Sequence, residues 1–131
     1  MPDDPRPCIL LVEDEPLIRM LACDMLDDLG YSALEAGSGS EALEFDDLAL
    51  AGAAGLMIDL GLPDHSGEEV ARRLRQRRPD LPVILTTGAD AAQARAGLAA
   101  GGPVAILQKP YQLNDLERVL RALPTVAGRV A

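Results

Sequence analysis

The stretch Ile9-Leu10-Leu11-Val12-Glu13-Asp14-Glu15-Pro16 joins an apolar run to three acidic residues and a proline. A short run that is apolar throughout is typical of a strand covered on both faces of a sheet. Proline suits the first position of a helix, and the apolar residues after it keep the helical period. The stretch therefore predicts a buried strand that leads through an acidic turn into a helix. The apolar side of that helix would comprise Ile18, Leu21, Ala22, Met25 and Leu29.

Apolar runs and helical patterns alternate along the rest of the chain. Strict alternation of this kind implies a parallel sheet with right-handed crossovers, so the expected fold is a doubly wound α/β domain. The segment 49–55 reads as a loose connection, and Pro124 would end the last helix. The five predicted strands are residues 8–12, 31–35, 55–60, 82–86 and 103–107. Capping-box pairs predict four further helix starts, at Ser38 with Glu41, Ser66 with Glu69, Asp90 with Gln93 and Asn114 with Glu117.

Length and composition limit the classes of protein to which the chain can belong. At 131 residues it fits one domain, which we expect to span residues 7–123, between a disordered segment 1–6 and a tail 124–131. The net charge of −9 argues against nucleic-acid binding, which relies on Lys and Arg to neutralise phosphates. No apolar stretch reaches the roughly 18 residues of a membrane span, and the acidic start is unlike a signal peptide. We therefore expect a cytoplasmic protein without membrane contact, with Cys8 and Cys23 as small buried hydrophobic residues.

Charged and hydroxyl residues follow the predicted strands. In an open parallel sheet the carboxyl ends of the strands meet at one edge, where ligands bind. Lys109 is the only lysine beside 11 arginines, which indicates a need for a compact ammonium group at that position. The first strand leads to Glu13, Asp14 and Glu15, the third to Asp59, the fourth to Thr86, Thr87 and Gly88, and the fifth to Lys109 and Pro110.

This combination of groups indicates a chemistry. Carboxylates gathered at one edge repel each other unless a cation or a proton lies between them. Magnesium takes one or two carboxylates, keeps several waters and completes its octahedron with a phosphate oxygen. Hydroxyl and ammonium groups suit the remaining phosphate oxygens. The sequence therefore predicts a Mg²⁺-assisted phosphoryl-transfer site without an attached nucleotide.

Four stretches of the chain resemble the receiver domain of two-component response regulators. They are residues 9–16, 57–67, 82–88 and 108–111, and the resemblance covers residues 7 to about 123. It implies a flavodoxin-like (βα)5 fold, in which five parallel strands lie in the order 2-1-3-4-5.

The resemblance also implies a role for each residue at the predicted edge. Asp59 would accept a phosphoryl group from a phosphohistidine, with Mg²⁺ as cofactor. The metal ligands that it implies are Glu13, Asp14, Asp59 and the backbone carbonyl of Gly61. Of the remaining matched residues, Thr87 would be the switch hydroxyl, Lys109 would contact the acyl phosphate, and Pro110 would follow a cis peptide bond.

The function implied is that of a single-domain response regulator that signals by binding a protein. Its expected partners are a sensor histidine kinase or a histidine phosphotransferase, and a downstream protein bound at the face of the fourth helix, fifth strand and fifth helix. The family often has an aromatic switch residue three positions before the lysine, where this chain has Ile106; Tyr111 offers a different aromatic group. Residues expected to contribute to the binding face are Ala91, Arg95, Leu98, Ile106, Arg118 and Arg121.

The residues also bear on other classes of protein. A phosphatase of the haloacid-dehalogenase kind would carry a second aspartate two residues after Asp59, where this chain has Gly61, so we expect no enzyme beyond a protein that forms and hydrolyses its own aspartyl phosphate. Two alternatives stay open: the chain could be a receiver from a hybrid histidine kinase, or it could pass its phosphoryl group to a histidine phosphotransferase as a shuttle. We expect Glu15 to serve the helix start, His65 to lie in solvent, and residues 37–39 to form a turn with a helix cap. The exposed face of the third helix would carry Arg72, Arg73, Arg75, Arg77 and Arg78.

Overall fold

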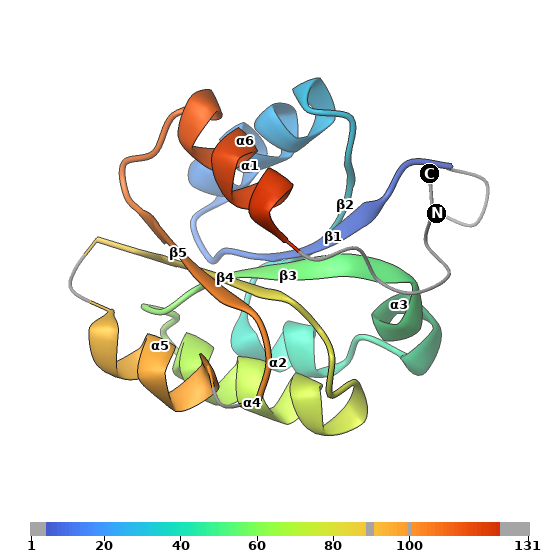
Figure 1. Cartoon of the computed structure of the whole chain (residues 1–131), viewed down its shortest axis with the longest axis vertical. Coiled ribbons are helices and arrows are strands. Elements are labelled where there is room, and N and C mark those ends of the chain that lie inside the picture. Colours follow the sequence, from blue (N-terminus) through green and yellow to red (C-terminus); the bar gives the residue numbers. More distant parts are fainter. Residues whose placement is uncertain (1–4, 89–90, 100, 124–131) are drawn as a thin grey trace.

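Five parallel strands form one sheet in the order β2-β1-β3-β4-β5 (Figure 1). The computed structural model describes residues 5–88, 91–99 and 101–123. This arrangement confirms the predicted doubly wound α/β fold and its strand order. The strands are β1 (Cys8–Val12), β2 (Ser32–Ala36), β3 (Ala53–Asp59), β4 (Val83–Thr87) and β5 (Val104–Gln108).

Figure 1 shows helices on both faces of this sheet. Among the described residues, two helices pack on one face and four on the other. Successive residues of a strand point to opposite faces. Ile9 and Leu11 therefore pack with α1 and α6, whereas Leu10 and Val12 pack with the four helices of the other face. No helix in the described ranges has the length and apolarity of a membrane-spanning segment. The first face carries α1 (Pro16–Asp28) and α6 (Leu113–Ala122), and the second carries α2 (Gly39–Leu43), α3 (Asp47–Gly52), α4 (Gly67–Arg77) and α5 (Ala92–Ala99).

Helix starts test the capping predictions directly. The Ser38 and Ser66 hydroxyls each accept a backbone N–H bond, from Glu41 and Glu69 at 3.1 Å, as predicted. The expected cap at Asn114 is wrong, because α6 begins at Leu113 and the Gln112 N–H donates to the Asp115 carboxylate. Asp90 lies outside the described residues, as do residues 1–4 and 124–131 of the two predicted terminal segments.

The predicted loose connection at residues 49–55 is also wrong. Residues 47–52 form α3, and β3 begins directly after it at Ala53. The Asp46 carboxylate begins this helix by accepting the Ala49 N–H at 2.8 Å. A side chain that satisfies a free N–H group stabilises even a single helical turn. The four alanines and two glycines among residues 49–55 concealed this helix in the sequence pattern.

Arg75 of α4 and Arg78, the residue that follows this helix, are buried, contrary to the prediction that all five arginines lie on an exposed face. Arg75 and Arg78 are each 7% exposed. The Arg75 guanidinium donates to three backbone carbonyls: those of Leu81 at 3.0 Å, Leu98 at 2.6 Å and Pro103. Burial lowers the pKa of Arg75. Arg78 donates in the same way to the carbonyls of Leu50 and Ala53, whereas Arg72, Arg73 and Arg77 are exposed and pair with Glu68, Glu69 and Asp47.

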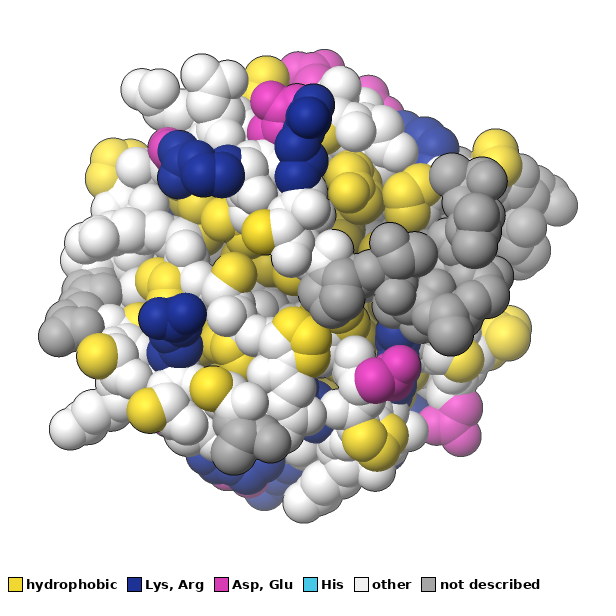
Figure 2. Space-filling view, in the orientation of Figure 1, with side chains coloured by type: hydrophobic (Ala, Val, Ile, Leu, Met, Phe, Trp, Pro, Cys, Tyr) yellow, Lys and Arg dark blue, Asp and Glu magenta, His cyan; other side chains and the backbone are white. Residues whose placement is uncertain are grey.

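The face formed by α5, β5 and α6 corresponds to the expected partner surface. Figure 2 shows hydrophobic side chains across its middle, with basic side chains around them. Arg95, Arg118 and Arg121 are exposed there, as expected. The expectation for Ala91 and Leu98 is wrong, because they are only 6% and 3% exposed and belong to the interior.

Neither cysteine is fully buried, which corrects the expectation for both. Cys8 and Cys23 are free thiols of intermediate exposure. Cys23 packs beside the core of the sheet face that α1 covers without being part of it. Burial raises the pKa of Cys23 to about 11, and the neighbouring Glu35 carboxylate acts in the same direction.

We predict that Arg75→Met lowers the free energy of unfolding by about 2–4 kcal/mol, because three buried carbonyls lose their donor. Because methionine keeps most of the apolar stem of the side chain, the loss of stability measures mainly the contribution of the hydrogen bonds. Urea denaturation measures the change. Arg73→Met on the exposed side of the same helix is the control, and should stay within about 0.5 kcal/mol of the wild type. Equal stability of Arg75→Met and the control would contradict the prediction.

Candidate functional site

The carboxyl ends of four strands bring the predicted residues together. Glu13 follows β1, Asp59 ends β3, Thr87 ends β4 and Lys109 follows β5. The register places Asp59 opposite Thr86, and Thr87 opposite Gln108. One carboxylate oxygen from each of Glu13, Asp14 and Asp59 lies within 4.8 Å of the others. The predicted convergence of acidic residues is therefore present in the structure.

Lys109 lies between two of these carboxylates. Its Nζ donates to Glu13 Oε1 at 3.0 Å and to Asp59 Oδ2 at 3.1 Å. Its backbone N–H donates to the carbonyl of Thr87 at 2.7 Å, which links β5 to the end of β4. The peptide bond between Lys109 and Pro110 is cis, as predicted. The compact ammonium group thus reaches two carboxylates that are 46 residues apart in sequence, Glu13 and Asp59.

Backbone N–H groups hold the other oxygen of each carboxylate. Gly61 N–H donates to Asp59 Oδ1 at 3.1 Å, and Glu15 N–H donates to Glu13 Oε2 at 3.1 Å. The Arg19 guanidinium also donates to the carbonyl of Glu13 at 2.8 Å. Each carboxylate is therefore fixed between a backbone donor and the lysine. Sequence reasoning placed Glu15 at the helix start, where it is the N-cap residue of α1, but it missed Arg19.

The site carries more negative than positive charge. When all are ionised, the three carboxylates and the single ammonium leave an excess of two negative charges. Glu13 and Asp59 are only 3% and 7% exposed, and burial raises the pKa of Glu13 despite its hydrogen bonds. Burial opposes the charge on Lys109 too, but the bonds to Glu13 and Asp59 outweigh it and raise the pKa of Lys109.

A divalent cation would compensate this excess. Three carboxylate groups whose oxygens converge within 4.8 Å suit a hard cation such as Mg²⁺, which prefers oxygen ligands. The donor set therefore fits the magnesium ion that the sequence predicts. The Asp14 carboxylate is partly exposed, so one side of the cluster is open to solvent and to a second ligand.

Comparison with known proteins agrees with this geometry. The family model for the response regulator receiver domain matches residues 9–121. The chain belongs to this family. Curated relatives of the receiver include "Probable transcriptional regulatory protein TcrX" of Mycobacterium tuberculosis, 36% identical over 121 residues that make up 88% of this chain and 48% of that protein. "Response regulator MprA" of Mycobacterium leprae is 38% identical over 116 residues, 88% of this chain and 50% of that protein.

A third relative belongs to a larger protein. "Sensor kinase CckA" of Brucella abortus is 36% identical over 117 residues, which cover 88% of this chain and 12% of the kinase. The receiver thus spans about half the length of TcrX and MprA and a small part of the kinase.

Solved structures show the same fold. Vibrio cholerae chemotaxis protein CheY4 matches with a TM-score of 0.78 at 24% identity, over 91% of this chain and 99% of that one. The receiver domain of the sensor histidine kinase PA1611 of Pseudomonas aeruginosa matches with a TM-score of 0.73 at 28% identity, over 90% and 97% of the two chains. That structure has a magnesium ion coordinated in the active site cleft.

Gly67 of the receiver is a site residue to which sequence reasoning assigned no role. It begins α4 directly against the backbone of Asp59, and its N–H donates to the carbonyl of Leu60 at 3.2 Å. A Cβ atom at this position would lie 2.2 Å from the carbonyl oxygen of Asp59. Only glycine permits so close an approach between the helix and the strand. The signal available in the sequence was the position of this glycine directly after the Ser66 cap.

The two residues predicted to act as the switch lie on neighbouring strands. Thr87 is buried at the end of β4. Ile106 pairs in register with Leu85 and packs, partly buried, against the core under α4 and α5. The switch roles of Thr87 and Ile106 stay predictions, as does the metal-binding role of the Gly61 carbonyl.

We predict that Gly67→Ala destabilises the receiver by about 3 kcal/mol or more, because the added methyl group overlaps backbone that cannot move aside cheaply. Thermal or urea unfolding measures the loss. Gly52→Ala is the matched control, since a Cβ atom there meets nothing within 4 Å. It should be neutral or stabilising by up to about 1 kcal/mol. A Gly67→Ala protein as stable as the control would refute the close contact.

A second prediction concerns alkaline pH. Burial raises the pKa of Tyr111 to about 12, and the nearby charges of Glu13 and Asp59 act in the same direction as burial. A tyrosine in the unfolded chain titrates near pH ~10. Between these values the unfolded state releases a proton that the folded state keeps, so stability is complete below about pH 10 and falls as the pH rises toward 12.

Urea unfolding at a series of alkaline pH values checks this dependence. Tyr111→Phe should make the decline shallower, although the raised pKa of Lys109 leaves part of it in place. Absorbance of tyrosinate in a Tyr31→Phe protein follows Tyr111 directly, because the chain has only two tyrosines. An identical alkaline decline in wild type and Tyr111→Phe would rule the assignment out.

Proposed function

We propose that the receiver accepts a phosphoryl group on Asp59 from the phosphohistidine of a sensor histidine kinase or a histidine phosphotransferase. The observation that carries the proposal is the position of Asp59. Its carboxylate lies beside those of Glu13 and Asp14, with one oxygen on Lys109 Nζ and the other on the Gly61 N–H. A carboxylate fixed in this way is oriented for attack on phosphorus.

The transfer exchanges one bond to phosphorus for another. An oxygen of Asp59 attacks the phosphorus atom, the P–N bond of the phosphohistidine breaks, and its electron pair returns to the imidazole nitrogen. A mixed anhydride on Asp59 results. Glu13, Asp14 and Asp59 together with the Gly61 carbonyl would hold a magnesium ion, which would supply positive charge for the phosphoryl oxygens. Lys109 is already beside Asp59 and protonated, so its ammonium donates to a phosphoryl oxygen without a large movement.

The same arrangement connects the site to the partner-binding face. The Lys109 N–H donates to the Thr87 carbonyl and so joins the end of β4 to the end of β5, which is part of that face. We propose that the Thr87 hydroxyl binds the phosphoryl group and that the α5-β5-α6 face then changes its affinity for a downstream protein. Any such change must come from a difference between two states in their interaction with the added charge.

That face offers a suitable surface for a protein. A hollow of about 430 Å³ opens on it, and Ile106 lies among its lining residues with basic and apolar neighbours. A mainly apolar hollow with one arginine in its lining suits a protein partner with apolar and acidic side chains. The lining residues are Arg95, Pro103, Val104, Ala105, Ile106, Val119, Ala122 and Leu123.

The receiver in this proposal turns over only its own aspartyl phosphate. The place of a second catalytic aspartate is taken by Gly61, so para-nitrophenyl phosphate should be hydrolysed no faster than a trace. Action as an effector or as a phosphate shuttle both fit the site. The single-domain organisation and the cytoplasmic location stay predictions, since the matched response regulators are about twice as long as this chain.

We predict that phosphoramidate, a small P–N donor, phosphorylates the wild-type receiver in the presence of Mg²⁺ and that Asp59→Asn abolishes the product. Asp14→Asn should slow phosphorylation by about 10-fold or more, because it removes a proposed metal ligand. Mass spectrometry of the intact protein detects the added phosphoryl group.

Glu15→Gln is the matched control for Asp14→Asn. It removes a neighbouring charge that lies outside the three-carboxylate cluster, so its rate should stay within about twofold of the wild type. Phosphorylation of the wild type that proceeds equally well with a chelator, or of Asp59→Asn at the wild-type level, would show that the proposed function is wrong.

A further inference from the structure

Asp64 joins the loop after the phosphoacceptor strand to the start of a different helix. Its Oδ1 accepts the Gly39 N–H at 3.0 Å, and its Oδ2 accepts the Ser40 N–H at 2.8 Å. Gly39 and Ser40 are the first two residues of α2, and the Ser38 hydroxyl caps the third. The first N–H groups of a helix have no partner within the helix. The capping of α2 is therefore shared between a local serine and an aspartate 25 residues away from Gly39.

The loop that carries Asp64 also carries Gly61. It leaves β3 after Asp59, where Leu60 N–H donates to the carbonyl of Thr86 at 3.0 Å, and it returns at Gly67. Between these points the Gly61 N–H contacts Asp59 Oδ1. Asp64 ties the middle of the same loop to α2, so the loop is held at both ends and at its centre.

Charge and close packing both support this contact. The N–H bond from Ser40, with that from Gly39, holds the pKa of Asp64 well below its usual range, so the carboxylate is ionised. A Cβ atom at Gly39 would lie 3.0 Å from His65 Cβ and 3.1 Å from Asp64 Oδ1. His65 is accordingly half-buried, which corrects its assignment to solvent. Glycine at position 39 leaves the space that the loop needs.

We propose that Asp64 is a positioning residue for phosphorylation of Asp59. By clamping the loop to α2, it holds Gly61 against the Asp59 carboxylate and so fixes the direction of the attacking oxygens. Asp64 does not belong to the three-carboxylate cluster and acts through Gly61. The effect on phosphorylation rests on the proposed function, whereas the clamp itself rests on the two hydrogen bonds of Asp64.

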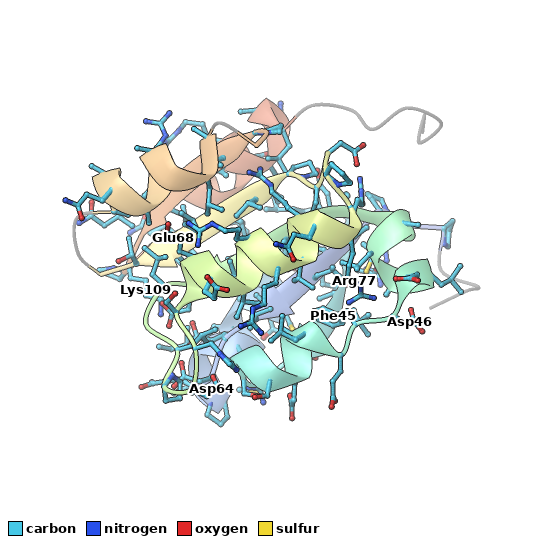
Figure 3. The ribbon with its side chains drawn as sticks, turned by 90° about the horizontal axis from the view of Figure 1, so that it is seen from below. Phe45, Asp46, Asp64, Glu68, Arg77 and Lys109 are labelled. Atoms are coloured by element: carbon cyan, nitrogen blue, oxygen red, sulfur yellow. The ribbon has the colours of Figure 1, made fainter. Side chains whose placement is uncertain are left out.

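Asp46 provides a matched control for Asp64. Both are exposed aspartates that cap a short helix through backbone N–H groups. Figure 3 shows Asp64 at the same end of the sheet as Lys109, whereas Asp46 lies at the opposite end. Replacing either residue removes a helix cap, but only Asp64→Ala releases the loop beside Asp59. A difference between the two variants therefore separates positioning from stability.

The experiment compares wild type, Asp64→Ala, Asp64→Asn and Asp46→Ala in two measurements. The first is the rate of phosphorylation by phosphoramidate with Mg²⁺, and the second is hydrogen exchange of the Gly61 amide followed by NMR. We expect Asp64→Ala to slow phosphorylation about 10-fold and to speed Gly61 exchange by a similar factor. Asp64→Asn keeps an acceptor oxygen and should recover part of both, while Asp46→Ala stays within about twofold of the wild type.

The outcomes distinguish failure of the proposed function from failure of the positioning role of Asp64. A wild-type receiver that phosphoramidate does not label would contradict the proposed function, and Gly61 exchange would then still decide whether Asp64 holds the loop. Unchanged Gly61 exchange in Asp64→Ala, or equal slowing in Asp64→Ala and Asp46→Ala, would overturn the positioning role. If Asp64→Ala fails to fold, Asp64→Asn with weakened Gly61 protection supports the role, and Asp64→Asn with full protection and a normal rate opposes it.

Discussion

The ammonium group of Lys109 between Glu13 and Asp59 is the interaction on which the site depends. Without a cation, acidic side chains from two strand ends could not lie this close in a region of low exposure. One ammonium does not balance three carboxylates, and the remaining negative charge gives the site its preference for a divalent cation. Lys109 thus offsets part of the repulsion in the same cluster of carboxylates that could hold a metal ion.

Charged side chains bind the backbone of the segments around this cluster. Arg19 reaches from α1 to the carbonyl of Glu13, Glu41 accepts the N–H of Gly37, and Asp64 accepts two N–H groups of α2. Each contact joins a charged side chain to backbone of another segment. Backbone positions at the sheet edge are therefore set by charge-assisted hydrogen bonds as well as by the strands.

The local patterns of the sequence predicted the strands, two of the caps and the convergence of Glu13, Asp59 and Lys109. These features follow from short-range periodicity and from the rule that parallel strands end at one edge. Other features depend on which distant backbone lies nearby. The carbonyls that accept hydrogen bonds from Arg75 belong to segments that follow α4. The five arginines of the sequence therefore could not show by themselves which guanidinium groups would reach buried carbonyls. The contact that requires glycine at position 67 is hidden for the same reason.

Helix α4 connects two regions that the sheet keeps apart. Its first residue, Gly67, lies against the backbone carbonyl of Asp59, and Arg75 near its other end donates to the Leu98 carbonyl in the last turn of α5. An α-helix of this length is a stiff strut roughly 16 Å long. The molecule thus possesses a mechanical link from Asp59 to α5 that bypasses β4 and β5, and in which no aromatic side chain takes part.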